Sequence, residues 1–195
     1  MHDTGRLLFS VMNNEEQNWI NECLQGNAEA FRKLVDAYRH YAYTLAMRIT
    51  KNEEDAEEVT QDAFMKAYVS LKSFKGESKF STWFYKIVLN MAMTKVRRRK
   101  PAHQNIDDVH VSLANDDEPM RKTDRTYYVE KAINALPEDE AAIVTLFYME
   151  GQSLGDIAEV VNLSLSNTKV KLFRARNKMA GLLKNELKEN IYSLL

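Results

Sequence analysis

The chain has 195 residues, which allows one large domain or two small ones. Its hydrophobic share of 45% is that of an ordinary globular protein, and no apolar run approaches the roughly 20 residues needed to span a bilayer. A net charge of −1 excludes a protein that coats DNA unaided, and the single cysteine, Cys23, excludes an internal disulfide framework.

These features predict a cytoplasmic protein without membrane insertion. A lone cysteine suits a reducing compartment, and the apolar run at residues 7–12 is too short for a signal peptide. The four histidines lie far apart and lack the spacing of metal ligands, so we expect neither a metal site nor a cofactor.

The charges are segregated along the chain, and this pattern bears on its partners. Residues 53–62 and 107–118 are acidic, whereas residues 97–100 and 169–178 are basic. Such segregation indicates one partner that is nucleic acid and another that is protein.

The first half of the chain predicts three main helices. Asn27 is a good N-cap for a helix reaching about Ile49, and Asn52 is a second N-cap, followed by acids that a helix dipole favours. Asp55, Glu58 and Asp62 then share one helical face. This acidic row either docks on a basic surface of another protein or is an ordinary solvated face.

The third helix follows an aromatic loop and ends in a basic run. We expect residues 74–81 to form the loop, with Ser81 or Thr82 as N-cap, and the helix to end near Lys100 because Pro101 follows. Polar and aromatic side chains share one side of it: Trp83, Lys86, Asn90 and Arg97. Such a row can stack on bases and hold phosphates, although the alternative is that these aromatics belong to the core.

Residues 101–125 lack helical or strand periodicity, and their prolines and acidic residues predict a linker. We therefore expect an all-α fold of two small helical domains, residues 14–100 and 126–195, joined by a flexible linker.

The second domain predicts a helix-turn-helix. Helices are expected over residues 126–136, 137–150 and 154–161, with a turn at residues 162–164 and a long helix from Leu165. One face of that last helix should pack inward: Thr168, Leu172, Ala175, Met179 and Leu183. The opposite row could meet base edges in a major groove while flanking cations, Lys171 and Lys178 among them, reach phosphates: Ser166, Val170, Phe173, Arg174 and Asn177. A purely structural amphipathic helix is the alternative.

Both halves together resemble a known family. Its motifs are matched, in order, by GNAEAFRKLVDAYRHY, DAEEVTQDAFMKAY, FSTWFYKIVLNMA with RRRK, ALPEDEAAIVTLFYMEGQSLGDIAEVVNLS, and NTKVKLFRARNKM. In these motifs the chain resembles an extracytoplasmic-function (ECF) sigma factor of the sigma-70 family, over about residues 26–184.

The resemblance implies three binding surfaces. The residues implied to bind core RNA polymerase, at its β′ clamp helices, are Asp55, Glu58, Gln61, Asp62 and Phe64. Those implied to recognise and melt the minus-ten promoter element are Phe74, Lys79, Phe80, Ser81, Trp83, Tyr85, Lys86, Asn90, Arg97 and Arg98. Those implied to read the minus-thirty-five element are Ser166, Asn167, Lys169, Val170, Lys171, Phe173, Arg174 and Arg176.

The resemblance therefore implies a transcription initiation factor without catalytic activity. It would bind core polymerase, also at the β flap, recognise promoter DNA and promote strand opening, under the control of an anti-sigma factor. The alternatives are a stand-alone helix-turn-helix transcriptional regulator and an enzyme acting on nucleic acid. The acidic row beside a basic aromatic helix disfavours the first, and carboxylates that do not converge with histidine, lysine or a metal set disfavour the second.

Overall fold

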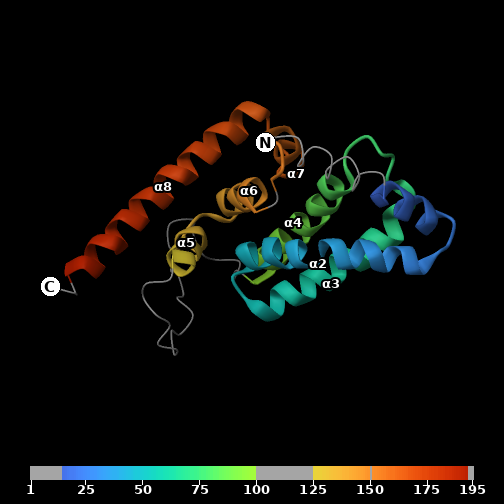
Figure 1. Cartoon of the computed structure of the whole chain (residues 1–195), viewed down its shortest axis with the longest axis horizontal. Coiled ribbons are helices and arrows are strands. Elements are labelled where there is room, and N and C mark those ends of the chain that lie inside the picture. Colours follow the sequence, from blue (N-terminus) through green and yellow to red (C-terminus); the bar gives the residue numbers. More distant parts are fainter. Residues whose placement is uncertain (1–14, 100–124, 150, 193–195) are drawn as a thin grey trace, which may run out of the picture.

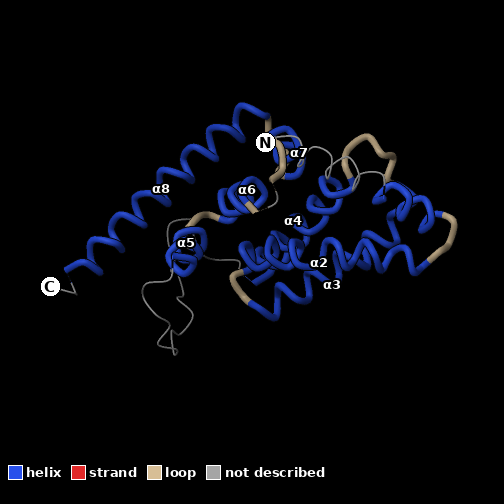
Figure 2. Tube along the Cα trace, viewed as in Figure 1, coloured by secondary structure: helices blue, strands red, loops and turns tan. Residues whose placement is uncertain are grey.

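The structure, a computed structural model, describes residues 15–99, 125–149 and 151–192. These residues form helices and the turns and loops between them, which confirms the predicted all-α fold (Figure 2). A first helix covers residues 15–24. The others are α2 (Ala28–Thr50), α3 (Glu53–Ser70), the 3-10 helix η1 (Leu71–Ser73), α4 (Phe80–Arg99), α5 (Arg125–Asn134), α6 (Glu138–Tyr148), α7 (Leu154–Val160) and α8 (Leu165–Tyr192).

Side-chain caps determine where α2 and α3 begin, as the sequence predicts. The Asn27 side-chain oxygen accepts a hydrogen bond from the backbone N–H of Glu29 at 3.1 Å. The Asn52 side-chain oxygen accepts one from the backbone N–H of Asp55 at 2.8 Å. Between the two helices Lys51 adopts a left-handed conformation, with φ of 52°, which ends α2 and turns the chain toward α3.

Helices α2, α3 and α4 form the body of the N-terminal half (Figure 1). Small side chains let the helices approach closely, while aromatic rings fill the space between them. The Phe64 ring of α3 lies 4.6 Å from the Phe84 ring of α4, and Tyr38 of α2 lies against Phe84 at 6.1 Å. The fully buried alanines of this core are Ala30, Ala42, Ala46, Ala56, Ala63, Ala67 and Ala92.

Helix α4 begins earlier than the sequence suggested. Phe80 and Ser81 were expected in the loop, but both lie in the first turn of α4, and the loop covers only residues 74–79. The reason is packing, because Phe80 is buried and stacks on Phe84 one turn later, with ring centroids 5.8 Å apart.

The predicted helix-turn-helix is present in the C-terminal half. Ser153 caps α7 by accepting a hydrogen bond from the backbone N–H of Asp156, and Asn162 takes the left-handed conformation in the turn, with φ of 54°. The inward face of α8 agrees with the prediction: Thr168, Leu172 and Ala175 are buried. The preceding helices differ slightly from prediction, since α5 ends at Asn134 and Pro137 is the N-cap of α6 rather than its first residue.

The two halves pack against each other. Helix α6 lies against α2, and α7 lies against α4, so one hydrophobic core continues across both halves (Figure 1). Polar contacts reinforce the junction: Arg48 of α2 donates to Glu130 at 2.9 Å and to Asn134 at 3.0 Å. The expected linker, residues 101–125, lies outside the described residues except for Arg125, which begins α5.

Candidate protein and nucleic-acid interfaces

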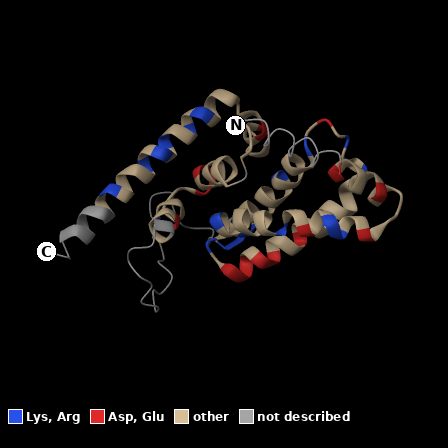
Figure 3. Cartoon of the chain, viewed as in Figure 1, with Lys and Arg blue, Asp and Glu red and all other residues tan. Residues whose placement is uncertain are grey.

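An exposed stripe runs along α3, opposite its buried alanines. Its N-terminal part is acidic, as Figure 3 shows, and its C-terminal part is apolar. Met65 and Val69 are 66% and 74% exposed, so the helix leaves large hydrophobic side chains in water. The remaining exposed residues of the stripe are Glu54, Glu57, Glu58, Gln61, Asp62 and Tyr68.

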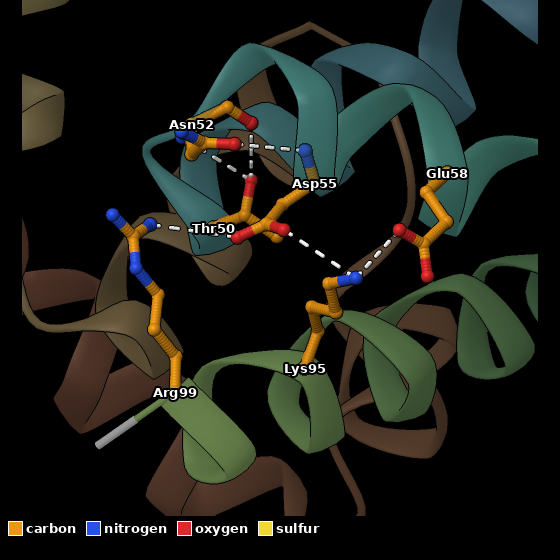
Figure 4. Close-up of polar contacts among 6 residues, drawn as sticks. All are labelled: Thr50, Asn52, Asp55, Glu58, Lys95 and Arg99. Atoms are coloured by element: carbon orange, nitrogen blue, oxygen red, sulfur yellow. Dashed lines mark hydrogen bonds and ion pairs between the residues drawn. The ribbon is translucent and has the colours of Figure 1, made fainter. Parts of the chain in front are cut away.

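Two acids of the predicted polymerase-binding set also join α3 to α4 (Figure 4). Lys95 of α4 contacts Glu58 at 2.6 Å and Asp55 at 3.4 Å, and Arg99 contacts Asp55 at 3.4 Å. The Glu58 hydrogen bond, with the Asp55 contact, holds the pKa of Lys95 above its ordinary value. The basic end of α4 is therefore fastened to the acidic start of α3, which the sequence did not indicate.

The members of the polymerase-binding set differ in exposure. Gln61 and Asp62 are exposed on the stripe, whereas Asp55 is partly covered by its α4 partners. Phe64 lies in the core, packed between Phe31 and Phe84. In this arrangement Phe64 therefore packs on the buried side of α3 and is not part of its exposed stripe.

The predicted minus-ten residues also differ in exposure. Phe80, Ser81 and Tyr85 are buried in the core. Trp83 and Phe74 are partly buried, with ring centroids 5.3 Å apart, while Lys86 is half-buried. Asn90, Arg97 and Arg98 are exposed along α4, and Lys79 is exposed at its start. The structure thus joins an aromatic cluster at one end of α4 to an exposed polar and basic row at the other.

Lys79 forms an ion pair with the helix-turn-helix. Its ammonium group lies 2.7 Å from the carboxylate of Asp156 on α7, which also accepts a hydrogen bond from Ser153. Partial burial acts to raise the pKa of Asp156, but the hydrogen bonds from Lys79 and Ser153 outweigh it, so the pKa lies below its ordinary value. No short-range pattern marks Asp156 as the partner of Lys79, because 77 positions separate them.

A cavity of about 620 Å³ lies between α4 and the turn of the helix-turn-helix. Asn90, Thr94 and Arg97 line it from α4, and Asn162 and Leu163 from the turn. Two predicted minus-ten residues therefore face the C-terminal half of the chain in this arrangement.

The outward row of α8 is exposed, as predicted. Phe173 is 64% exposed and Val170 is 46% exposed, and Ser166, Arg174 and Asn177 are exposed too. Asn167 and Lys169, which flank the row and belong to the predicted minus-thirty-five set, are also exposed. Arg176 differs, because its guanidinium lies 5.1 Å from the ring centroid of Phe147 and 5.3 Å from that of Tyr148. Lys171 differs too, because it forms an ion pair with Asp139 of α6.

A second cavity, of about 630 Å³, is almost wholly apolar. It lies between α5, α6 and α8, and Arg48 of α2 contributes to its wall. Its main apolar lining residues are Val129, Ile133, Val144, Tyr148, Met179 and Leu183. Among the described residues, no helix is long and apolar enough to cross a membrane, and no three potential metal ligands gather.

Comparison with known proteins identifies the family. Residues 34–101 match the model for sigma-70 region 2, and residues 127–179 match that for sigma-70, region 4. The chain is 34% identical over 173 residues to the ECF RNA polymerase sigma-E factor of Haemophilus influenzae, covering 83% of this chain and 91% of that protein. It is 30% identical over 187 residues to the RNA polymerase sigma-H factor of Pseudomonas aeruginosa, covering 90% and 97%. The chain therefore belongs to the sigma-70 family, as a member of its ECF group of RNA polymerase sigma factors.

Solved structures share the fold. The chain resembles CnrH in complex with the cytosolic domain of CnrY at 23% identity, with a TM-score of 0.67 over 88% of this chain and 98% of that one. It also resembles the sigma factor RpoE of Bartonella quintana, solved with the anti-sigma factor NepR, at 24% identity and a TM-score of 0.67 over 80% and 98%.

Proposed function

We propose that this sigma factor docks on core RNA polymerase through the exposed stripe of α3 and reads promoter DNA with α4 and α8. The polar and basic row of α4 contacts the minus-ten element, and the outward row of α8 contacts the minus-thirty-five element. The N-terminal domain, residues 14–100, and the C-terminal domain, residues 126–195, carry these tasks separately, with residues 101–125 connecting them. The chain works in the cytoplasm and performs no catalysis.

The observation that carries this proposal is the exposure of Phe173. A phenyl ring in water on the outer face of α8 serves no packing purpose, since Leu172 and Ala175 already supply the buried face. Within a major groove the same ring can contact thymine methyl groups, and the neighbouring Arg174 can reach phosphates or base edges.

Strand opening follows from differential binding. Unstacking a base costs a few kcal/mol, and a pocket that stacks and holds the flipped base recovers that cost. The aromatic cluster of Phe74, Phe80 and Trp83 at the start of α4 is the place for such a pocket. The loop over residues 74–79 has to shift to expose these rings, because Phe80 is buried in this arrangement.

Two further contacts belong to the proposal. The apolar cavity between α5, α6 and α8 accepts a hydrophobic segment of the polymerase β flap. An anti-sigma factor regulates the chain, as supported by the likeness to RpoE, which was solved with one.

The proposal is tested by co-elution with purified core RNA polymerase on a sizing column. The informative variant is Gln61→Lys with Asp62→Lys, because both side chains are exposed on the α3 stripe. Reversal at Asp55 is less informative, since it also breaks the contacts with Lys95 and Arg99. The matched control is Glu159→Lys, an exposed acid on α7.

We expect the wild type and the Glu159→Lys control to co-elute with core polymerase and the α3 variant to elute alone. Retention of the α3 variant would contradict the proposed docking surface. A wild-type chain that ignores core polymerase but shifts duplex DNA would instead favour a stand-alone regulator.

A further inference from the structure

We propose that Lys171 and Lys178 are positioning residues, which fasten the recognition helix α8 to α6 and do not bind DNA phosphates. This inference rests on the proposed function of α8. It divides the cations of the helix into two groups with different tasks. The division cannot be made from the sequence, in which all of them look alike as flanking basic residues.

The first contact is a buried carboxylate with a cation on it. The side chain of Glu140, in the first turn of α6, is 8% exposed, and both of its oxygens accept hydrogen bonds from Lys178, at 3.0 and 2.8 Å. A carboxylate that loses such a partner is left charged and desolvated, which is strongly unfavourable. If Lys178 moved from Glu140 to a DNA phosphate, the buried Glu140 carboxylate would be left without its partner, which is unfavourable.

The second contact repeats the first, two turns earlier on α8. Lys171 forms an ion pair with Asp139, and Asp139 is itself held by a 2.8 Å hydrogen bond from the backbone N–H of Glu140. Because Lys171 and Lys178 are seven residues apart, they lie on one side of α8 and meet neighbouring acids of α6. Two ion pairs along one edge prevent α8 from rolling about its axis.

On the opposite edge of α8, the contact with α6 is a cation–π contact and not an ion pair. Arg176 lies over the rings of Phe147 and Tyr148, at the C-terminal end of α6. The buried residues of α8 lie between the two edges, so the outward row is presented to solvent in one orientation. Between residues 165 and 183, all of which are described, Lys169 and Arg174 are then the cations with no ion pair or ring contact in the structure.

This arrangement has a measurable consequence in the salt dependence of DNA binding. Each phosphate neutralised by a cation contributes about −0.9 to the slope of log affinity against log salt concentration. A lysine already neutralised by Glu140 or Asp139 contributes no such term. Removing Lys169 should therefore change the slope, whereas removing Lys178 together with its acid should not.

The test uses the full-length chain and a 30-base-pair duplex of random sequence, with affinity measured by fluorescence anisotropy at several salt concentrations. Thermal unfolding is followed on the same samples. The variants are Lys178→Gln, the double variant Glu140→Gln with Lys178→Gln, and the control Lys169→Gln. The double variant removes both charges, and its two amides can still hydrogen-bond to each other.

We expect Lys178→Gln to lower the melting temperature and weaken DNA binding several-fold, and the double variant to restore both with an unchanged salt slope. Lys169→Gln should leave the melting temperature unchanged and reduce the magnitude of the slope by about 0.9. A double variant that stays weak, with a slope reduced as in Lys169→Gln, would overturn the inference. The melting temperature judges the fastening separately from DNA binding by the free chain: restored melting in the double variant supports it, and unrestored melting refutes it.

Discussion

Asn52 shows how one side chain fixes the start of α3, the helix proposed to dock on the polymerase. It accepts the hydrogen bond that begins α3, and the same turn places Asp55 beside Lys95 and Arg99 of α4 (Figure 4). A cap of this kind satisfies a backbone donor that would otherwise have no partner within the helix. The start of α3 and its attachment to α4 therefore depend on a residue outside the proposed polymerase-binding set.

Replacing this cap should weaken the fold by a predictable amount. We expect Asn52→Ala to lower the free energy of unfolding by about 1 kcal/mol, because the N-terminal N–H of Asp55 loses its acceptor. Urea denaturation followed by circular dichroism measures this change. Asn18→Ala, at an exposed position within the first helix, is the control and should stay within about 0.5 kcal/mol of wild type. Equal losses in the two variants would refute the capping role.

At the scale of elements, the helix-turn-helix depends on a close approach of α7 and α8. Ala158 is 7% exposed, and its carbonyl oxygen accepts a hydrogen bond from the backbone N–H of Leu163 at 2.9 Å, which closes the turn. A small side chain fits there because the turn folds directly over it.

Enlarging that side chain should disturb the element. We expect Ala158→Leu to lower the free energy of unfolding by about 1–3 kcal/mol, since overpacking forces neighbouring groups apart. The adjacent Glu159 is exposed, so Glu159→Leu is the matched control and should change stability by less than about 0.5 kcal/mol. Calorimetry measures the stability of both variants. An Ala158→Leu variant as stable as the wild type would show that the site accommodates a larger side chain.

Elements were predictable where their signals are local. The caps at Asn27 and Asn52, the turn at residues 162–164 and the inward face of α8 all follow from short-range patterns, and the structure confirms them. The start of α4 was misplaced because Phe80 is drawn into the helix by packing on Phe84, which local propensity does not report.

The site was less predictable than the fold, for the same reason. Apart from Phe80 and Ser81, its residues lie on the elements that the sequence predicted, but their partners are distant in sequence. Lys95 meets Glu58 across 37 positions, and Lys171 meets Asp139 across 32. A basic residue that is paired in the fold and one that is available to DNA have the same appearance in a sequence, so only the structure separates them.

At the scale of the whole molecule, the described arrangement brings the two proposed DNA-reading surfaces too close together. Elements named minus-ten and minus-thirty-five are centred about 25 base pairs apart, or roughly 85 Å of duplex. Here Lys79, beside α4, contacts Asp156 on α7 at 2.7 Å. Helix α8, which follows α7 after a short turn, is only about 42 Å long. Simultaneous reading of both elements therefore requires the two halves to separate.

Weakening the junction should favour the separated form. We expect Glu130→Arg to increase the radius of gyration measured by small-angle X-ray scattering, because the new guanidinium repels Arg48 and replaces the contact at 2.9 Å. Glu130 lies outside the α3 stripe but lines the cavity proposed for the β flap, so this variant is judged by its radius of gyration and not by binding to core polymerase. Glu138→Arg, on α6, is the comparison variant, and an equal expansion in both would contradict a specific role for the Arg48 contact.

The junction should also respond to acid in a defined direction. Because the pKa of Asp156 lies below its ordinary value of 3.8, its pairing with Lys79 is complete above pH 3.8 and is lost as the pH falls through the lower value. We expect the radius of gyration to stay constant from about pH 7 to pH 5 and to rise in stronger acid. Asp156→Asn, which keeps an acceptor for the Ser153 hydroxyl, should already be expanded at neutral pH and is the control for other groups that titrate in acid. A wild-type transition centred above pH 5 would assign the effect to another group.

Transcription reconstituted from purified parts tests the central claim most directly. Core RNA polymerase would transcribe fragmented genomic DNA of the source organism with and without this chain, and the 5′ ends of the RNA would be sequenced. We expect new start sites that depend on the chain and share two upstream sequence elements, and we expect them to vanish with the Gln61→Lys and Asp62→Lys variant. The same start sites with core polymerase alone would contradict its role as a sigma factor.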